Sequence, residues 1–422
     1  MLRAYKYKIK PTREQQEKLN TSLGASRFIY NYALSRRINE YKENKSFLSD
    51  KQLYQEINKM RSVVNLDDDM RDYSWMMDIP GQVIINTIRN QSVAFKNMTK
   101  HGFGFPKFKK KNRCRDSFCL FNPQNSLIDI NFLKHEIRLS KLGWIRFRPN
   151  EEFNTDNHEI RNVTVSKTRD TYWISVLVEN HQPLPPKAKV KDDDSSVGID
   201  LGLMEFATLS TGEKIDNPRF LEISLKRMRM LNKKMSRQQK GSKRREQTIM
   251  KISRLHEKTA NRRIDFLHKL SCDLVKRYDT ICIEDLDVRG MIQHGHLSRS
   301  ISSVGWSMFT SMLSYKADWK GKNLLKVNRF YTSSKTCNVC GAVNKSLTLA
   351  DRSWICTSCL ETHDRDINAS INIRDKAIYD YHKKNKQSVG TPDLTGMEME
   401  DTTSMKCSCM LDNDVIVIDG VG

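Results

Sequence analysis

Long apolar runs are missing from this sequence, which argues against a membrane-spanning helix of about 20 consecutive apolar residues. The opening segment, MLRAYKYKIK, is charged where a secretory signal peptide would be apolar. The glycine fingerprints of P-loop NTPases and dinucleotide-binding proteins are also missing, and no internal repeat is found. We therefore expect a soluble, cytosolic protein without either of these glycine-rich nucleotide-binding loops.

Acidic residues are in deficit: 50 Asp and Glu stand against 72 Lys and Arg, for a net charge of +22. Such an excess of cations indicates a polyanionic partner, because Lys and Arg release counterions from phosphates. An anionic membrane surface is the competing interpretation. The length of 422 residues exceeds what one simple core can fill and predicts two to four domains.

The first half of the chain reads as strand, helices, then strands again. Residues 3–10 alternate like a strand, and Thr12 with Gln15 predicts a capping box at the start of a helix. Apolar spacing predicts helices within 11–100, with a break near Gly24. Short alternating segments between 126 and 179 predict a small β-barrel or sandwich, which the first strand could join.

Aromatic and basic residues alternate in HGFGFPKFKKKNRCR, residues 101–115. Stacking rings beside phosphate-pairing cations suit nucleic acid, and a solvated basic loop with anchoring Phe residues is an equal alternative. A second basic region, residues 221–278, has an apolar seam at helical spacing and a turn at KGSKRR. It predicts a helical hairpin whose charged face favours nucleic acid over mere solvation.

The second half begins after a linker at 183–196 with two strands joined by a turn at Gly202. A β-branched strand is predicted over 279–286 and an amphipathic helix over 307–322. After Arg374 the composition turns polar, and a disordered or loosely attached tail is expected.

Two Cys-x-x-Cys pairs stand a short loop apart. Four thiolates at this spacing predict one tetrahedral, structural zinc ion, with a binding free energy on the order of 10 kcal/mol. Leu360 follows the second pair where Gly is usual, so that knuckle is expected to bend differently. Six other cysteines lack such spacing and are expected to be buried or free thiols. The predicted zinc ligands are Cys337, Cys340, Cys356 and Cys359.

Acidic residues at strand ends form a second group of candidate site residues, after the four cysteines. Asp200 ends VGID and Glu284 ends ICIE, while Asp364 and Asp366 precede a predicted helix. Each acid alone is more often a cap or turn residue. Together they could converge on two magnesium ions roughly 4 Å apart, the arrangement that phosphodiester cleavage uses. His294 and His296 are interpreted as parts of a mobile loop rather than as ligands.

These residues together resemble TnpB, the OrfB-type family of insertion sequences, and the related miniature type V CRISPR effectors. The resemblance runs from near the amino terminus to about Arg374. The segments that carry it are LGASRFIYNYAL, FGFPKFKKK, KLGWIRF, VGIDLGLMEFATLSTGEKI, NRRIDFLHKLS, IEDL, SISSVGWSMFTSMLSYKADWKGK, YTSSKTCNVCG and THDRDINASINI.

The resemblance implies an α+β multidomain fold, with a β-barrel wedge domain, a helical recognition module, and an RNase H-like (RuvC) α/β domain that carries an inserted zinc ribbon. The implied bounds are 1–10 and 101–185 for the wedge, 11–100 for the helical module, 186–330 and 361–378 for the nuclease domain, 331–360 for the ribbon, and 379–422 for a disordered tail.

The resemblance also implies an activity, RNA-guided cleavage of double-stranded DNA beside a short flanking motif. The partners would be a guide RNA and the target DNA, in a prokaryotic cytoplasm and on the nucleoid when DNA is bound. The family pattern places the third acid just ahead of Asn-Ala, which selects Asp366 over Asp364. Asp200, Glu284 and Asp366 are then the catalytic magnesium ligands. TnpB-like proteins tend to act as monomers and the smallest CRISPR relatives as dimers, so the resemblance leaves the oligomeric state open, with a monomer favoured.

Three alternatives remain open. A non-enzymatic basic RNA-binding protein is one, and the three acids count against it. A guided repressor would need one acid missing, and none is. A strand-joining transposase of the OrfB type could share the acids, but the ribbon lodged between the second and third acid favours the guide-dependent branch. The Tyr and His-hydrophobic-His constellation of single-strand transposases is not found.

Overall fold

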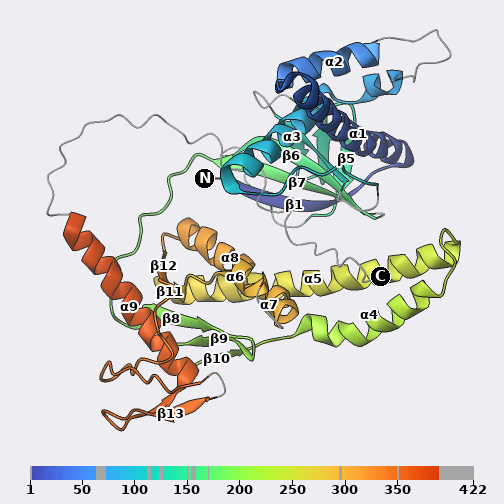
Figure 1. Cartoon of the computed structure of the whole chain (residues 1–422). Helices are drawn as coiled ribbons and strands as arrows, with labels where there is room; N and C mark the ends of the chain where they lie inside the picture. Colours follow the sequence, from blue (N-terminus) through green and yellow to red (C-terminus); the bar gives the residue numbers. More distant parts are fainter. Residues whose placement is uncertain are drawn as a thin grey trace. The chain divides into compact units, whose positions relative to one another are not determined.

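The computed structural model (Figure 1) folds as two compact units, residues 1–183 and 184–422. No helix in the part of the chain it describes is long and apolar enough to cross a membrane. The structure describes residues 2–62, 73–111, 116–122, 127–149, 152–153, 158–169, 171–293, 297–348 and 351–388.

The first unit places helices after its first strand and before the remaining strands, in the order that the sequence predicts. Its elements are β1 (Leu2–Lys10), α1 (Arg13–Asn44), α2 (Asp50–Ser62), the 3-10 helix η1 (Ser74–Asp78), α3 (Gly81–His101), β2 (Asp116–Phe121), β3 (Asp129–Asn131), β4 (Glu136–Leu139), β5 (Gly143–Phe147), β6 (His158–Thr168) and β7 (Thr171–Asn180).

These strands form a seven-stranded antiparallel sheet in the order β2-β6-β7-β1-β5-β4-β3. Strand β1 lies in its middle, with Tyr7 opposite Ile174 of β7 and Ile9 opposite Phe147 of β5. The prediction that the first strand joins the later ones is confirmed. Among the described residues no strand pairing joins the terminal strands β2 and β3, so closure of this sheet into a barrel stays a prediction.

Helix α1 begins with the predicted capping box. The Thr12 hydroxyl accepts from the Gln15 backbone N–H at 3.3 Å, and the Gln15 side-chain oxygen accepts from Thr12 N–H at 3.1 Å. The predicted break near Gly24 is wrong, since α1 continues to Asn44. A glycine costs a helix only about 1 kcal/mol, and the burial of the flanking Leu23 and Ala25 outweighs that cost.

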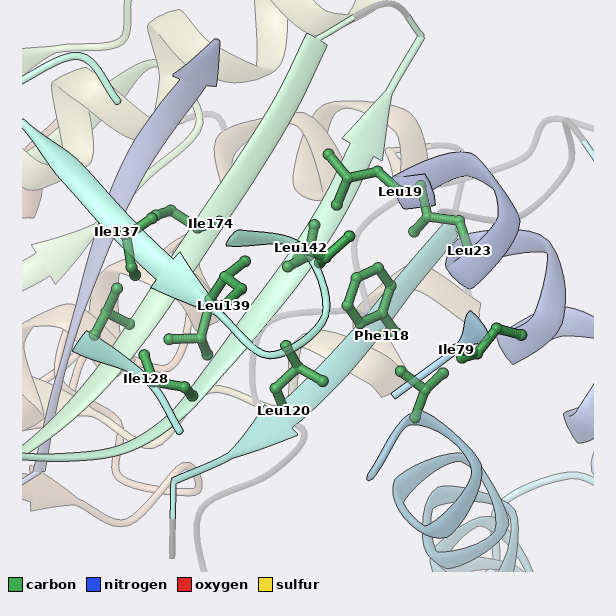
Figure 2. Close-up of a cluster of buried hydrophobic side chains, with 14 of the residues drawn as sticks. Leu19, Leu23, Ile79, Phe118, Leu120, Ile128, Ile137, Leu139, Leu142 and Ile174 are labelled. Carbon is green, nitrogen blue, oxygen red and sulfur yellow. The ribbon is translucent and has the colours of Figure 1, made fainter. Parts of the chain in front are cut away.

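The core of the first unit is one cluster that includes side chains of the helices and of most of the strands. Figure 2 shows Leu19 and Leu23 of α1 beside Phe118 of β2, in a cluster that extends to β4 and β7. Strand β2 is an end strand of the sheet, and helix side chains bond its backbone: Ser26 donates to Ser117 O at 3.1 Å, and Asn86 donates to Cys119 O at 2.8 Å. The helices thus cover an edge that would otherwise be open to pairing.

The second unit is a mixed α/β assembly around a five-stranded sheet in the order β10-β9-β8-β11-β12. Its elements are β8 (Ser196–Leu201), β9 (Glu205–Leu209), β10 (Lys214–Asp216), α4 (Phe220–Ser236), α5 (Lys243–Arg277), β11 (Thr280–Glu284), α6 (Val288–Gln293), α7 (Ser298–Val304), α8 (Trp306–Trp319), β12 (Asn323–Val327), β13 (Ser353–Ile355), β14 (Thr362–Asp364) and α9 (Arg365–Ser388).

Strand direction changes across this sheet. Strands β8, β9 and β10 are antiparallel neighbours, whereas β11 runs parallel to both β8 and β12. The predicted turn at Gly202 joins β8 to β9, and α4 and α5 form the predicted hairpin, with Ser242 capping α5. The small hairpin β13–β14 belongs to the cysteine-bearing segment between β12 and α9.

Helix α9 extends past the predicted start of the tail. It runs to Ser388, so the residues from 379 to 388 are helical and not a disordered segment. Ala377 and Ile378 are buried, Tyr381 packs on the same cluster, and a Lys376–Asp380 ion pair at 2.8 Å spans one turn. These contacts stabilise the helix although the composition of this segment is polar. The rest of the predicted tail, 389–422, lies outside the described residues.

Candidate functional site

Asp200 and Glu284 stand side by side at the ends of neighbouring parallel strands. Ile199 of β8 is paired with Ile283 of β11, so the next residue on each strand reaches the same edge of the sheet. Both strands are buried up to this point, which explains their unbroken apolar runs in the sequence. The sheet therefore presents both carboxyl groups at the same end of the neighbouring strands β8 and β11, which Figure 1 labels.

Helix α9 brings a third carboxyl group to this edge. A Cβ placed on Gly198 of β8 would lie 1.9 Å from the carbonyl oxygen of Ser370, so helix and strand backbones touch there. Asp200 lies two residues beyond Gly198 and faces the same side, while Asp366 lies one helical turn before Ser370. Glu284 shares the face of Cys282, which packs on α9 as well. Asp200 and Glu284 thus face the start of α9, where Asp366 lies.

Asp200 feels the charges of the other two carboxyl groups. Burial, followed by the negative charges of Glu284 and Asp366, raises the pKa of Asp200 to about 7. Burial also raises the pKa of Glu284, against a hydrogen bond from the Ser333 hydroxyl at 2.5 Å. Crowded carboxylates of this kind are stabilised by cations, and oxygen ligands of this type are what magnesium prefers.

Asp364 has a different environment from Asp366. Its Oδ1 accepts from the backbone N–H groups of Asp366 and Ile367, both at 3.1 Å, and its Oδ2 pairs with Lys214 at 2.7 Å. Burial opposes ionisation, but Lys214 and these N–H groups outweigh it and lower the pKa of Asp364. Asp364 therefore caps α9, and Asp366 is the acid whose charge reaches Asp200.

The four predicted zinc ligands come together. Their sulfur atoms all lie within 4.8 Å of one another, and the Cys337–Cys359 and Cys340–Cys356 Sγ pairs are each 3.6 Å apart. A tetrahedral site with Zn–S bonds of about 2.3 Å has sulfur atoms about 3.8 Å apart, whereas a disulfide bond is about 2.0 Å long. The geometry fits a closed four-thiolate zinc site. No other group of metal-binding side chains this close is found among the described residues.

The two knuckles bend alike, so the expected difference at Leu360 is wrong. Gly341 N–H donates to Cys337 O and Leu360 N–H donates to Cys356 O, each at 2.9 Å. Gly341 has φ 76° and Leu360 has φ 60°. Leu360 adopts the left-handed conformation that its turn requires, at a cost of about 1 kcal/mol. The ring of His363 also reaches the site, with Nε2 3.1 Å from the Cys337 sulfur.

The remaining cysteines agree with the prediction where the structure describes them. Cys119, Cys272 and Cys282 are free thiols, and Cys282 is buried. Cys114, Cys407 and Cys409 lie outside the described residues, as do His294 and His296.

The aromatic and basic loop after α3 is held in place at two points. Asn31 of α1 bonds both the N–H and the C=O of Lys109, at 2.8 and 2.9 Å, and the ring of Phe105 meets that of Phe95 edge-on at 5.5 Å. Phe103 and Phe108 are 40% and 50% exposed. An anchored loop with exposed rings and lysines is a candidate surface for single-stranded nucleic acid. Residues 112–115 of this segment are not described.

The α4–α5 hairpin exposes a dense set of cations. Its helices pack through Met228, and the Ser224 and Thr259 hydroxyls are 3.0 Å apart. The exposed basic side chains include Lys226, Arg227, Arg229, Lys233, Lys234, Arg237, Lys240, Lys243, Arg244, Lys251, Arg254, Lys258 and Arg262. This distribution supports a phosphate-binding face.

Three sequence families match parts of the chain. The OrfB IS605 family, described as "Probable transposase", matches residues 174–294; the "Cas12f1-like, TNB domain" matches 306–373; and a "Helix-turn-helix domain" of OrfB IS605 proteins matches 1–46. The first two matches contain the three acids and the four clustered cysteines. The third covers β1 and α1, a strand followed by one continuous helix.

A curated protein of Streptomyces pristinaespiralis named "Putative RNA-guided DNA endonuclease" is 32% identical over 377 residues, which cover 88% of each chain. The chain belongs to the TnpB (OrfB) family. A second TnpB relative, "Putative RNA-guided DNA endonuclease InsQ" of Escherichia coli K12, is 30% identical over 88% of this chain and 91% of its own length.

The fold of this TnpB protein also matches a solved structure. The protein chain of a "Cas12f1-sgRNA-target DNA complex" superposes with a TM-score of 0.56 and 12% identity, over 89% of this chain and 98% of that one. The two chains thus share a fold across a wide divergence in sequence.

Sequence reasoning missed three polar residues beside the acids. Ser333 bonds Glu284, and Asn368 and Asn372 bond the backbone that leads to the first knuckle. The one available signal was the spacing of the two asparagines in INASINI, which places them on one face of a helix.

Proposed function

We propose that this TnpB-family protein is an RNA-guided DNA endonuclease that cleaves target DNA beside a short flanking motif, with Asp200, Glu284 and Asp366 as the ligands of two magnesium ions. The observation that carries this proposal is the convergence of the three carboxyl groups at one end of the strands, where burial and then the charges of Glu284 and Asp366 raise the pKa of Asp200. When bound, the two metal ions would activate water and stabilise the leaving oxygen.

The fold supports an RNase H-like nuclease domain in the second unit. Three antiparallel strands are followed by two parallel ones, and the acids lie where β8, β11 and α9 meet. We infer a structural zinc ion at the cysteine cluster, since four thiolates leave no position for a reacting water. The antiparallel sheet and helices of the first unit would form the wedge and recognition parts.

The chain's own residues have separable tasks in this proposal. Asp200, Glu284 and Asp366 would hold the metals, and Asp364 would fix the helix that carries Asp366. The hairpin cations and the Phe103–Phe108 loop would bind the guide RNA and the opened target. Base pairing would supply most of the sequence specificity. We propose that one chain acts per guide RNA, which light scattering of the purified complex would measure.

The test begins with copurification. The chain is expressed with its native flanking DNA, and the RNA that copurifies is sequenced. The complex is then given plasmids that carry the matching target beside randomised bases, with magnesium. One discrete RNA and cleavage beside one motif are expected. Bound RNA without cleavage would point to a guided repressor, and no discrete RNA would overturn RNA guidance.

A further inference from the structure

We infer that Ser333, Asn368 and Asn372 are positioning residues that orient Glu284 for metal binding and tie its position to that of Asp366. This inference rests on the proposed function, because it assigns a role toward the proposed magnesium site. It adds three residues from the segment before the first knuckle and from α9.

The two asparagines hold one stretch of backbone. They lie one turn apart on α9 and are 2% and 6% exposed. The Asn372 amide donates to Ser333 O at 2.8 Å and to Thr336 O at 2.6 Å, and the Asn368 amide donates to the same oxygens at 3.4 and 2.8 Å. The carbonyl groups of Ser333 and Thr336 are thereby fixed to the helix.

Asn368 also holds the first knuckle from the other side. Its side-chain oxygen accepts from the backbone N–H of Asn338 at 3.0 Å. Cys337 therefore lies between two backbone groups, Thr336 O and Asn338 N–H, that are both bonded to Asn368. A metal ion at the four cysteines would also restrain this backbone, through the Cys337 side chain.

Ser333 connects this restrained backbone to Glu284. Its side chain is buried, and its hydroxyl donates to Glu284 Oε1 at 2.5 Å while its carbonyl is held by the asparagines. A donor to one carboxylate oxygen leaves the other oxygen directed for a metal, which is the usual effect of such a contact. Asp366 lies two residues before Asn368, so a single helical segment sets the places of two of the three acids.

The test compares Ser333→Ala with Ser333→Thr, which keeps the hydroxyl. Mn²⁺ replaces magnesium as the probe, and its binding to the nucleic-acid-free full chain is measured by electron paramagnetic resonance. Zinc content and melting temperature are recorded for each variant. We expect Ser333→Ala to weaken Mn²⁺ binding about tenfold with zinc content unchanged, and Ser333→Thr to bind within about twofold of the parent chain.

A double-mutant cycle tests the route through α9. Asn372→Ala should weaken Mn²⁺ binding in the same direction, and Ser333→Ala combined with Asn372→Ala should be no weaker than the worse single variant, because both act along one series of contacts. Additive losses, or a Ser333→Ala variant that binds like the parent chain, would overturn the inference.

Asp200→Ala separates this inference from the proposed function. If Asp200→Ala binds Mn²⁺ as tightly as the parent chain, the acid cluster is not the metal site, and both proposals fail. If Asp200→Ala loses Mn²⁺ while Ser333→Ala does not, the metal site stands and only the positioning role is overturned.

Discussion

The backbone of Gly198 in β8 lies directly against that of Ser370 in α9, so close that a Cβ on Gly198 would meet Ser370 O at 1.9 Å and Arg374 N at 2.8 Å. Nothing larger than glycine fits unless the helix moves. Since β8 carries Asp200 and α9 carries Asp366, the spacing of these proposed metal ligands depends on this contact.

Gly198→Ala is expected to push α9 away from the sheet. Overpacking of this kind costs about 1–3 kcal/mol, and cleavage should fall further than stability alone explains because the acids separate. Thermal unfolding and plasmid cleavage measure the two effects. Gly24→Ala is the control: its Cβ meets open space within α1 and should stabilise the first unit by up to about 1 kcal/mol. Unchanged cleavage by Gly198→Ala would show that the helix contact does not govern the site.

Replacing any one of Asp200, Glu284 and Asp366 by Ala should reduce cleavage by on the order of a thousandfold or more, while guide RNA binding is retained. The matched control is Asp364→Asn, which keeps an oxygen to cap α9 and loses only the charge toward Lys214. Single-turnover cleavage and an RNA filter-binding assay separate the two properties. Robust cleavage by Asp366→Ala together with loss in Asp364→Asn would reverse the assignment of the third acid.

Cys337→Ser is expected to remove the zinc ion and lower the melting temperature, because the binding free energy of a structural zinc contributes to folding. Zinc per chain is measured by elemental analysis. Cys272→Ser provides the comparison, since Cys272 is an exposed thiol outside the cluster. Equal zinc content in the two variants would refute the four-thiolate site.

Leu360→Gly should stabilise the ribbon by about 1 kcal/mol, because glycine takes the left-handed conformation without the strain that Leu360 bears at φ 60°. Gly341→Ala, at the equivalent position of the first knuckle, should destabilise by a similar amount. The rate of zinc loss to a chelator reports both changes. A faster loss from Leu360→Gly would mean that the leucine side chain makes a contact worth more than the strain.

Phe108→Ala is expected to weaken binding of single-stranded nucleic acid by about 1–3 kcal/mol if a base stacks on this ring. Leu133→Ala is a matched control, since Leu133 is 96% exposed and lies in another turn of the same unit. Fluorescence anisotropy with the copurifying RNA, and with a single-stranded DNA, measures the affinity. Equal affinities for the two variants would favour a merely solvated loop.

Periodicity and spacing predicted much of this molecule. The alternation in residues 3–10, the capping box at Thr12 and the cysteine pairs each act over a few residues, so the sequence displays them. The predicted helix break at Gly24 was wrong because burial of the neighbouring side chains stabilises helix α1 there. The end of α9 was misplaced for the same reason: Tyr381 packs on a cluster that only the folded sheet creates.

The candidate site was predictable only in part. Asp200 and Glu284 end apolar strands, a pattern that is visible locally, and the family resemblance favoured Asp366 over Asp364. Ser333 could not have been found this way, since a serine before a knuckle looks like any polar loop residue. Its proposed role depends on its contacts with Glu284 and Asn372, which are distant from it in sequence and reach it only in the folded chain.

The contact between Gly198 and Ser370 also has a consequence for synthesis of the chain. Strand β8 leaves the ribosome long before α9, which follows the hairpin, β11, β12 and the ribbon. The carboxylate cluster is therefore a feature of high contact order that closes only when the last described helix docks. A nascent or truncated chain that lacks α9 therefore carries Asp200 and Glu284 without Asp366, so the proposed metal site is incomplete until synthesis of the helix is finished.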